Sequence, residues 1–111
     1  MSDVLSNALD GLCVSAVVFV QDYVQFQLDG PILSTYSLPS VTVEGRTIKS
    51  GDPGWRDALC SLIGVCVASV DASETLLTIR FAGNLRINVP LGAMTESGTL
   101  DSGAGLPNIV F

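Results

Sequence analysis

Three cysteines are the first side chains of this sequence with the potential for chemistry. Cys13 and Cys66 lie in strand-like segments, and Cys60 lies in a helix-like segment. A cysteine nucleophile usually needs a neighbouring base such as histidine, and this chain contains no His. A zinc site needs paired cysteines at short spacing, which these three lack. We therefore interpret them as small apolar core residues, and we expect no catalytic residue, no metal site and no cofactor.

A second candidate is a cluster of charged residues around the only tryptophan. A glycine-rich segment here leads into a predicted helix, whose N-terminus could hold an anion. Asp52 would itself cap that helix and Asp57 lies close by, and both carboxylates disfavour a bound anion. The Gly-Lys-Ser/Thr of a phosphate-binding P-loop is also missing. We favour helix capping and a surface ion pair over a ligand site for this cluster, which comprises Arg46, Lys49, Asp52, Trp55, Arg56 and Asp57.

Acidic residues are the third candidate, because paired carboxylates can hydrolyse glycosides or bind metals. Four of them fall in predicted turns, where Asp is common for its local hydrogen bonds. No spacing suggests a catalytic pair. We interpret them as solvated turn residues: Asp22, Asp29, Asp71 and Asp101.

The charge balance excludes some partners and favours others. The net charge is −6, and the five basic residues form no run, so we expect neither nucleic acid nor an anionic membrane surface as a partner. Only 14% of residues are charged, against about 25% in an average soluble domain, and 48% are hydrophobic. Large exposed apolar patches are uncommon on monomers. We therefore expect a homo-oligomer, with another protein as a further partner.

The sequence predicts a cytoplasmic protein. The longest apolar run, residues 12–20, is far shorter than the roughly 20 residues that cross a bilayer. The first ten residues contain two Asp and no Lys or Arg, which does not fit a signal peptide. Three cysteines without a secretory signal indicate reduced thiols.

An internal repeat determines where the candidate residues lie in the chain. The stretch Gly11–Val17 (GLCVSAV) returns as Gly64–Val70 (GVCVASV), 53 residues later, and the apolar pattern continues without a gap to Leu38. This similarity indicates duplication of one β unit. We expect one domain over residues 1–111, with repeats at 1–39 and 54–91.

Apolar periodicity predicts the elements of the first repeat. A helix over 2–10 is capped by Ser2 and ends at Gly11. Strands follow over 12–20, 23–28 and 31–38, with a hairpin turn at Asp29-Gly30. In the third strand we expect Ile32, Tyr36 and Leu38 to face inward.

The rest of the chain contains the second repeat and two further segments. Residues 40–53, without a counterpart in the second half, form an inserted hairpin and loop. The clearest helix covers 53–63, with Asp52 as N-cap and Pro53 at its first position. Further strands are expected over 65–70, 75–81 and 85–91. Residues 92–105 read as a flexible loop and 106–111 as a terminal strand.

These elements predict an α+β fold that is mostly antiparallel β. Two repeated helix-β-β-β units would form a sandwich or a partly closed barrel, with one clear helix. The alternative is a single antiparallel sheet with both helices on one side.

The segment Gly51–Gly64 (GDPGWRDALCSLIG), with the valine-rich strand and the Leu-Thr-Ile-Arg-Phe hairpin after it, resembles a group of small uncharacterised bacterial proteins. With the first repeat the likeness covers most of residues 11–91, and the tail after Leu91 departs from it. Several such domains are suspected toxin-immunity proteins. The resemblance implies no functional residues, but the acidic charge would suit neutralising a basic toxin.

The sequence thus predicts a non-enzymatic binding or assembly module that forms a homo-oligomer. The alternatives are an immunity-type protein and a small-molecule binder that uses the interior of a barrel or sandwich. Residues 17–20 are apolar on both strand faces, whereas the second copy turns polar after Val70, so we expect the partner surface on the first copy. Its candidate residues are Val17, Phe19, Tyr23, Arg46, Trp55 and Arg56.

Overall fold

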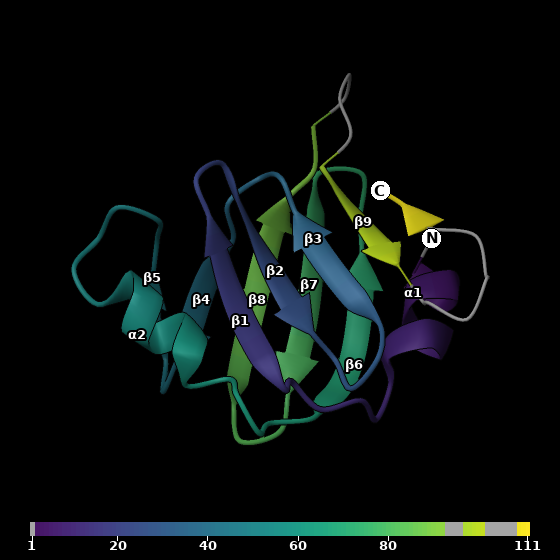
Figure 1. Ribbon diagram of the computed structural model, residues 1–111, viewed down its shortest axis with the longest axis horizontal. Helices are drawn as coiled ribbons and strands as arrows, with labels where there is room; N and C mark the ends of the chain where they lie inside the picture. Colours follow the sequence, from purple (N-terminus) through teal and green to yellow (C-terminus); the bar gives the residue numbers. More distant parts are fainter. Residues whose placement is uncertain (1, 93–96, 102–108) are drawn as a thin grey trace.

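Ten short strands form two antiparallel sheets that lie face to face (Figure 1). The computed structural model describes residues 2–92, 97–101 and 109–111. Sheet 1 has the order β1 (Ala16–Val20), β2 (Tyr23–Gln27), β3 (Ile32–Thr35), β9 (Gly98–Asp101) and β10 (Ile109–Val110). Sheet 2 has the order β5 (Arg46–Ile48), β4 (Ser40–Val43), β8 (Leu85–Pro90), β7 (Leu76–Phe81) and β6 (Val67–Ala72).

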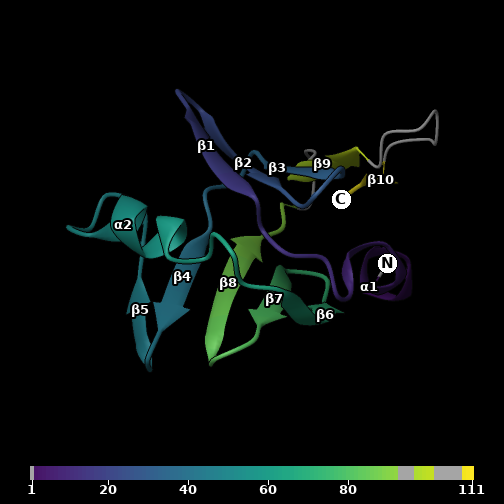
Figure 2. The same ribbon diagram turned by 60° about the horizontal axis from the view of Figure 1, so that its bottom comes forward.

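Two short helices lie at opposite ends of this sandwich (Figure 2). Helix α1 (Ser2–Leu9) packs against β6, and helix α2 (Trp55–Cys60) packs against β4 and β1. The predicted class, mostly antiparallel β in two layers, is confirmed, and the single-sheet alternative is wrong. The described strands form two separate sheets and no closed barrel.

The core is the space between the two sheets, because alternate side chains of each strand point into it. In β2 the residues Val24 and Phe26 are buried, and in β7 the residues Leu77 and Ile79 are buried in the same way. These are repeat partners at an offset of 53. Each copy therefore supplies one inner face of the sandwich, through the same alternation of buried and more exposed residues.

The repeat loses its 53-residue offset at the second hairpin of each copy. The turn between β2 and β3 has two residues, Asp29 and Gly30, whereas the turn between β7 and β8 has three, residues 82–84. Leu33 of β3 therefore corresponds to Ile87 of β8, at an offset of 54. The gapless alignment holds only as far as this turn.

The extra residue explains why the predicted inner face of the third strand is wrong. A shift of one residue moves every side chain of a strand to the other face of its sheet. Leu33 is buried, whereas Ile32 is only partly buried. Tyr36 and Leu38, which we expected to face inward, are 43% and 40% exposed.

The predicted insertion at 40–53 has a counterpart near the C-terminus. Strands β4 and β5 form a hairpin that joins sheet 2 beside β8, and β9 and β10 form a pair that joins sheet 1 beside β3. Each copy therefore gives its last two strands to the sheet of the other copy. Residues 98–101 form a strand and not the flexible loop that we expected, while 93–96 and 102–105 lie outside the described residues.

Cys13 and Cys66 form a disulfide, which corrects their interpretation as reduced core thiols. The two residues lie opposite each other in an isolated antiparallel bridge, and both are half-buried. Cys60 is a free thiol on α2 and is exposed, not buried.

The backbone around the disulfide shows where the two copies meet. The Gly11 N–H donates to the Val67 carbonyl at 3.0 Å, and the Gly64 N–H donates to the Val14 carbonyl at 2.7 Å. These two bonds are repeat equivalents of each other, since both pairs are related by 53 residues. A pseudo-twofold axis therefore passes through the disulfide.

Helix α2 begins later than predicted and is not capped by Asp52. Gly54 precedes the first helical residue with φ 85°, and no side chain caps the helix. The Asp52 carboxylate instead accepts a hydrogen bond from the Lys49 N–H at 3.0 Å, which closes the turn before the helix. The expected N-cap therefore stabilises a loop.

Replacing Gly98 by alanine should test the position of β9. A Cβ at Gly98 would collide with the ring of Phe111 and with the backbone oxygen of Ser34. We expect Gly98→Ala to lower the free energy of unfolding by about 1–3 kcal/mol, the usual cost of overpacking. Chemical denaturation would measure this loss. Thr99→Ala, next in the strand and only partly buried, is the control, and equal stability of both variants would contradict the placement of β9.

Candidate functional site

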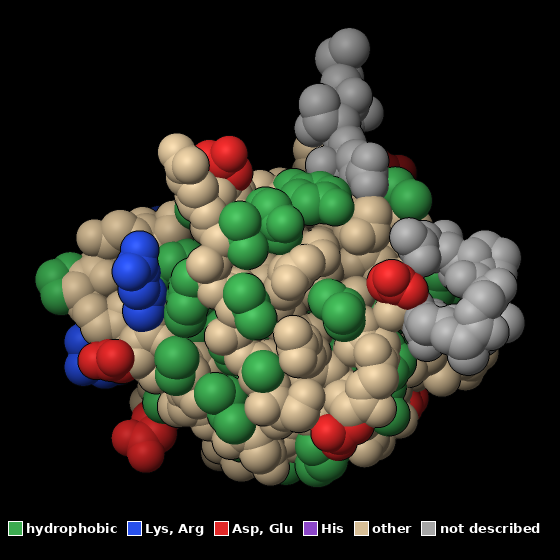
Figure 3. Space-filling view, viewed as in Figure 1, with side chains coloured by type: hydrophobic (Ala, Val, Ile, Leu, Met, Phe, Trp, Pro, Cys, Tyr) green, Lys and Arg blue, Asp and Glu red, His purple; other side chains and the backbone are tan. Residues whose placement is uncertain are grey.

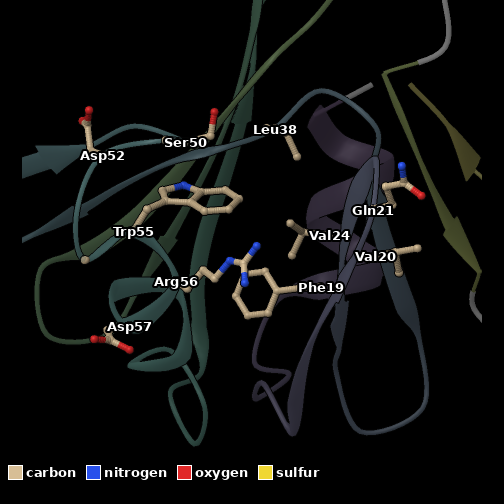
Figure 4. A pocket seen from close by; sticks show the side chains of 12 residues that line it. Phe19, Val20, Gln21, Val24, Leu38, Ser50, Asp52, Trp55, Arg56 and Asp57 are labelled. Carbon is tan, nitrogen blue, oxygen red and sulfur yellow. The ribbon is translucent and has the colours of Figure 1, made fainter.

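An open pocket of about 630 Å³ lies between the turn that joins β1 to β2 and the loop that leads into α2 (Figure 4). Its apolar wall comes from the middle and the end of the first copy and from the start of the second. Val20 and Leu38, which are 39% and 40% exposed, stand at its open side. The other apolar residues of the wall are Phe19, Val24 and Trp55.

Trp55 is the fixed part of this wall. It is the first residue of α2, it is 8% exposed, and its indole N–H donates to the buried carbonyl of Pro39 at 2.9 Å. Its ring meets Phe19 edge to face, with centroids 5.9 Å apart. Buried Trp commonly anchors its ring through such a bond, so the indole orientation is set before any ligand arrives.

Arg56 brings the only positive charge among the residues that line the pocket. Its guanidinium carbon lies 5.6 Å from the centroid of the Phe19 ring, a cation–π contact. Within the described part of the chain its side chain makes no hydrogen bond or ion pair, and the ion pair found there joins Arg80 to Asp71. The predicted surface ion pair of the cluster is therefore wrong for Arg56.

Two carboxylates also line the pocket, but they do not neutralise Arg56. Asp52 is occupied by the turn at Lys49. Figure 4 shows that Asp52 and Asp57 point away from the guanidinium, which lies beside Phe19. The pocket therefore has an acidic rim and a single cation over its apolar wall.

The structure brings together three of the six predicted surface residues, Phe19, Trp55 and Arg56. Val17 is not available to a partner, because it lies on the inner side of β1 and packs against the core. Tyr23 lies on the outer face of sheet 1, where its ring meets that of Tyr36 at 5.4 Å. Arg46 is exposed in β5 and does not line this pocket. Sequence reasoning missed Val24 and Leu38 as pocket residues, and their apolar type gave no signal for it.

The outer faces of the two sheets differ in charge, although the repeat relates them. In sheet 2 this face carries Asp71, Arg80 and Arg86, all exposed, and the first two form an ion pair. Their counterparts in sheet 1, at offsets of 53 and 54, are Val18, Gln27 and Ile32. Sheet 1 also has a carboxylate on its outer face, that of the exposed Asp101 in β9, which lies opposite Ile32. The outer face of sheet 2 is therefore charged, and that of sheet 1 has no charged side chain on β1, β2 or β3.

Figure 3 shows the neutral face, with sheet 1 toward the viewer. Apolar side chains are spread over it, and the charged groups lie mainly toward the rim. Hydrogen bonds between neutral groups complete it, such as Gln25 Nε2 to Ser34 Oγ at 3.2 Å. We call this surface the neutral face and define it by Val18, Tyr23, Gln25, Ile32, Ser34 and Tyr36.

The described residues contain neither a group of three metal-binding side chains nor a helix that could cross a membrane. The pocket at Trp55 and the neutral face are two surface features that bear on function, and a second open pocket of about 450 Å³ is lined by residues that include Arg80, Phe81 and Arg86. No protein-family model, no curated protein and no solved structure matches this chain.

Proposed function

We propose that this protein is a non-enzymatic assembly module that forms a homodimer through the neutral face. The observation that carries the proposal is the contrast between the two sheets. Duplicated sheets begin with the same residues, and a solvated sheet keeps polar or charged residues on its outer face. Sheet 2 has the charged residues Asp71 and Arg86 at two positions where sheet 1 has the apolar Val18 and Ile32, and at a third its Arg80 corresponds to the neutral Gln27.

A second copy of the chain is the partner that suits this face. The protein carries a net charge of −6, so two copies repel each other over most of their surfaces. A twofold interface places one patch against the same patch of the partner. The strands β1, β2 and β3 have no charged side chain, so two copies that meet over these strands bring no like charges together, and Asp101 of β9 lies beside this contact. A stable interface needs about 800 Å² from each partner, so this one would also include loops that border sheet 1.

Val18→Asp should convert the dimer into a monomer. The substitution copies Asp71, the counterpart of Val18 in sheet 2, and a twofold interface would bury two carboxylates, one from each copy. Such unpaired charges cost several kcal/mol in an interface. Analytical ultracentrifugation at micromolar concentration should give a dimer for the parent protein and the 11.6 kDa chain alone for the variant.

Ser69→Asp is the matched control, because it adds a carboxylate to the outer face of sheet 2, where Ser69 lies opposite Arg80. This variant should remain a dimer. A parent protein that sediments as a monomer would contradict the proposal. So would a Val18→Asp variant that is folded by circular dichroism and still a dimer.

A further inference from the structure

The pocket at Trp55 has a feature that dimerisation through the neutral face does not use. A guanidinium rests on an aromatic ring in an apolar wall, and no carboxylate of the described residues pairs with it. An arginine has five N–H donors in one plane, and stacking of its face leaves the donors at its edge free. Arg56 is therefore positioned to receive an anion from the pocket side.

We propose that this pocket binds a small organic carboxylate with an aromatic or branched apolar body. The carboxylate would accept hydrogen bonds from the edge of Arg56, a pairing whose geometry suits guanidinium well. The apolar body would lie against Leu38, Val20 and the exposed edge of the Trp55 ring. The volume of about 630 Å³ falls in the range of small-molecule sites.

The charges of the rim select a carboxylate over a phosphate or a larger polyanion. Asp52 and Asp57 line the same pocket as Arg56, so the pocket has two acids and one cation. A ligand with a single negative charge is repelled less by these acids than a doubly charged phosphate is. An apolar body also adds binding energy that an inorganic anion lacks.

The repeat gives an independent reason to regard the pocket as more than an accident of folding. The counterparts of Phe19 and Val20 in the second copy are Ala72 and Ser73, which could not build the same wall. Near α1, the residues at the positions of Trp55 and Arg56 in sequence are Ser2 and Asp3. The aromatic pair and the cation therefore occur in one copy only, and they occur together.

The single tryptophan of the chain makes the proposal directly testable. Its ring belongs to the pocket wall, so a ligand that enters should change the Trp55 emission. The probes are phenylacetate and phenylacetamide, which share a ring and a length but differ in charge. We expect saturable binding of phenylacetate at millimolar or lower concentration, at least about tenfold tighter than the amide, the usual advantage of a charge-assisted bond.

Arg56→Gln should remove the preference for the acid and leave binding of the amide unchanged. Arg46→Gln, which removes an exposed cation of β5 that does not line the pocket, is the matched control and should bind phenylacetate like the parent protein. Circular dichroism would verify that both variants are folded. An emission that does not respond to phenylacetate would overturn the proposal, as would equal binding of acid and amide or an unaltered preference in Arg56→Gln.

This inference stands apart from dimerisation. The Val18→Asp monomer should bind phenylacetate with the affinity of the parent protein, because Val18 does not line the pocket. A dimer without phenylacetate binding would refute the pocket proposal alone, and a monomer with full binding would refute the dimer alone.

Discussion

Replacing Cys13 and Cys66 by alanine together should lower the free energy of unfolding by about 4 kcal/mol. The disulfide closes a loop of 53 residues and so lowers the conformational entropy of the unfolded chain. Its removal restores this entropy and thereby favours unfolding. Small domains are stable by only about 5–15 kcal/mol, so the loss would be a large part of the total. Urea denaturation under non-reducing conditions would measure it.

Reduction and the third cysteine provide the controls for this prediction. A reducing agent should bring the parent protein to the stability of the double variant, and it should leave the double variant unchanged. Cys60→Ser should have no effect, since Cys60 is exposed and unbonded. If all three thiols of the native, unreduced protein reacted with a thiol reagent, the disulfide would be refuted.

The disulfide also bears on the compartment in which the protein works. Disulfides persist in oxidising compartments and are rare in a reducing cytoplasm. The cytoplasmic location that we inferred from the sequence relied partly on reduced thiols, and this part of its basis is gone. A disulfide that contributes about 4 kcal/mol to stability would be reduced in the cytoplasm. We therefore propose that the protein works in an oxidising compartment.

Local patterns predicted the strands well, because alternation reports which side of a strand is buried. The predicted strand over 23–28 is β2, Tyr23–Gln27, and the predicted hairpin over 41–48 is the pair β4 and β5. The disulfide was not predictable in this way. Cys13 and Cys66 occupy equivalent repeat positions, but equivalent residues touch only where the pseudo-twofold axis passes, and no sequence pattern locates that axis.

Strand β9 was missed because it begins with small residues, in the run Ser97-Gly98-Thr99. Gly98 lies under the ring of Phe111, and the Ser97 N–H donates to the Phe111 carbonyl at 2.7 Å. A run of Gly, Ser and Thr is typical of a loop, but here small side chains leave room for the C-terminal ring. Phe111 is 8% exposed, and its packing on Gly98 is the long-range contact that outweighs the local preference for a loop.

The candidate site was predicted in composition but not in arrangement. Phe19, Trp55 and Arg56 were all named as surface residues, yet Phe19 lies 36 positions before Trp55 in the sequence. Their contact depends on where α2 crosses β1, which is a tertiary feature. The charge of Arg56 was assigned to an ion pair because acids are near it in sequence, whereas its side chain packs on a ring.

The register of β3 leads to the second prediction of large effect. Leu33→Ala should lower the free energy of unfolding by about 2–5 kcal/mol, because it leaves a cavity in the core. Leu38→Ala removes the same atoms from a side chain that is 40% exposed and should cost about 0.5 kcal/mol or less. Both values would come from urea denaturation of the two variants beside the parent protein.

The comparison of these two leucines tests the turn geometry and not only the burial of one side chain. Under the gapless repeat Leu38 would face inward and Leu33 outward, so the order of the two losses would be reversed. The two-residue turn at Asp29-Gly30 determines which leucine faces inward. It pairs Leu33 of β3 with Phe26 of the neighbouring strand β2, whose side chain is in the core. Leu33 and Ile87 are then repeat counterparts, and each side chain points into the core toward the opposite sheet. Ile87→Ala should accordingly match Leu33→Ala in cost, and a loss that is small for one of them and large for the other would contradict the pseudo-twofold core.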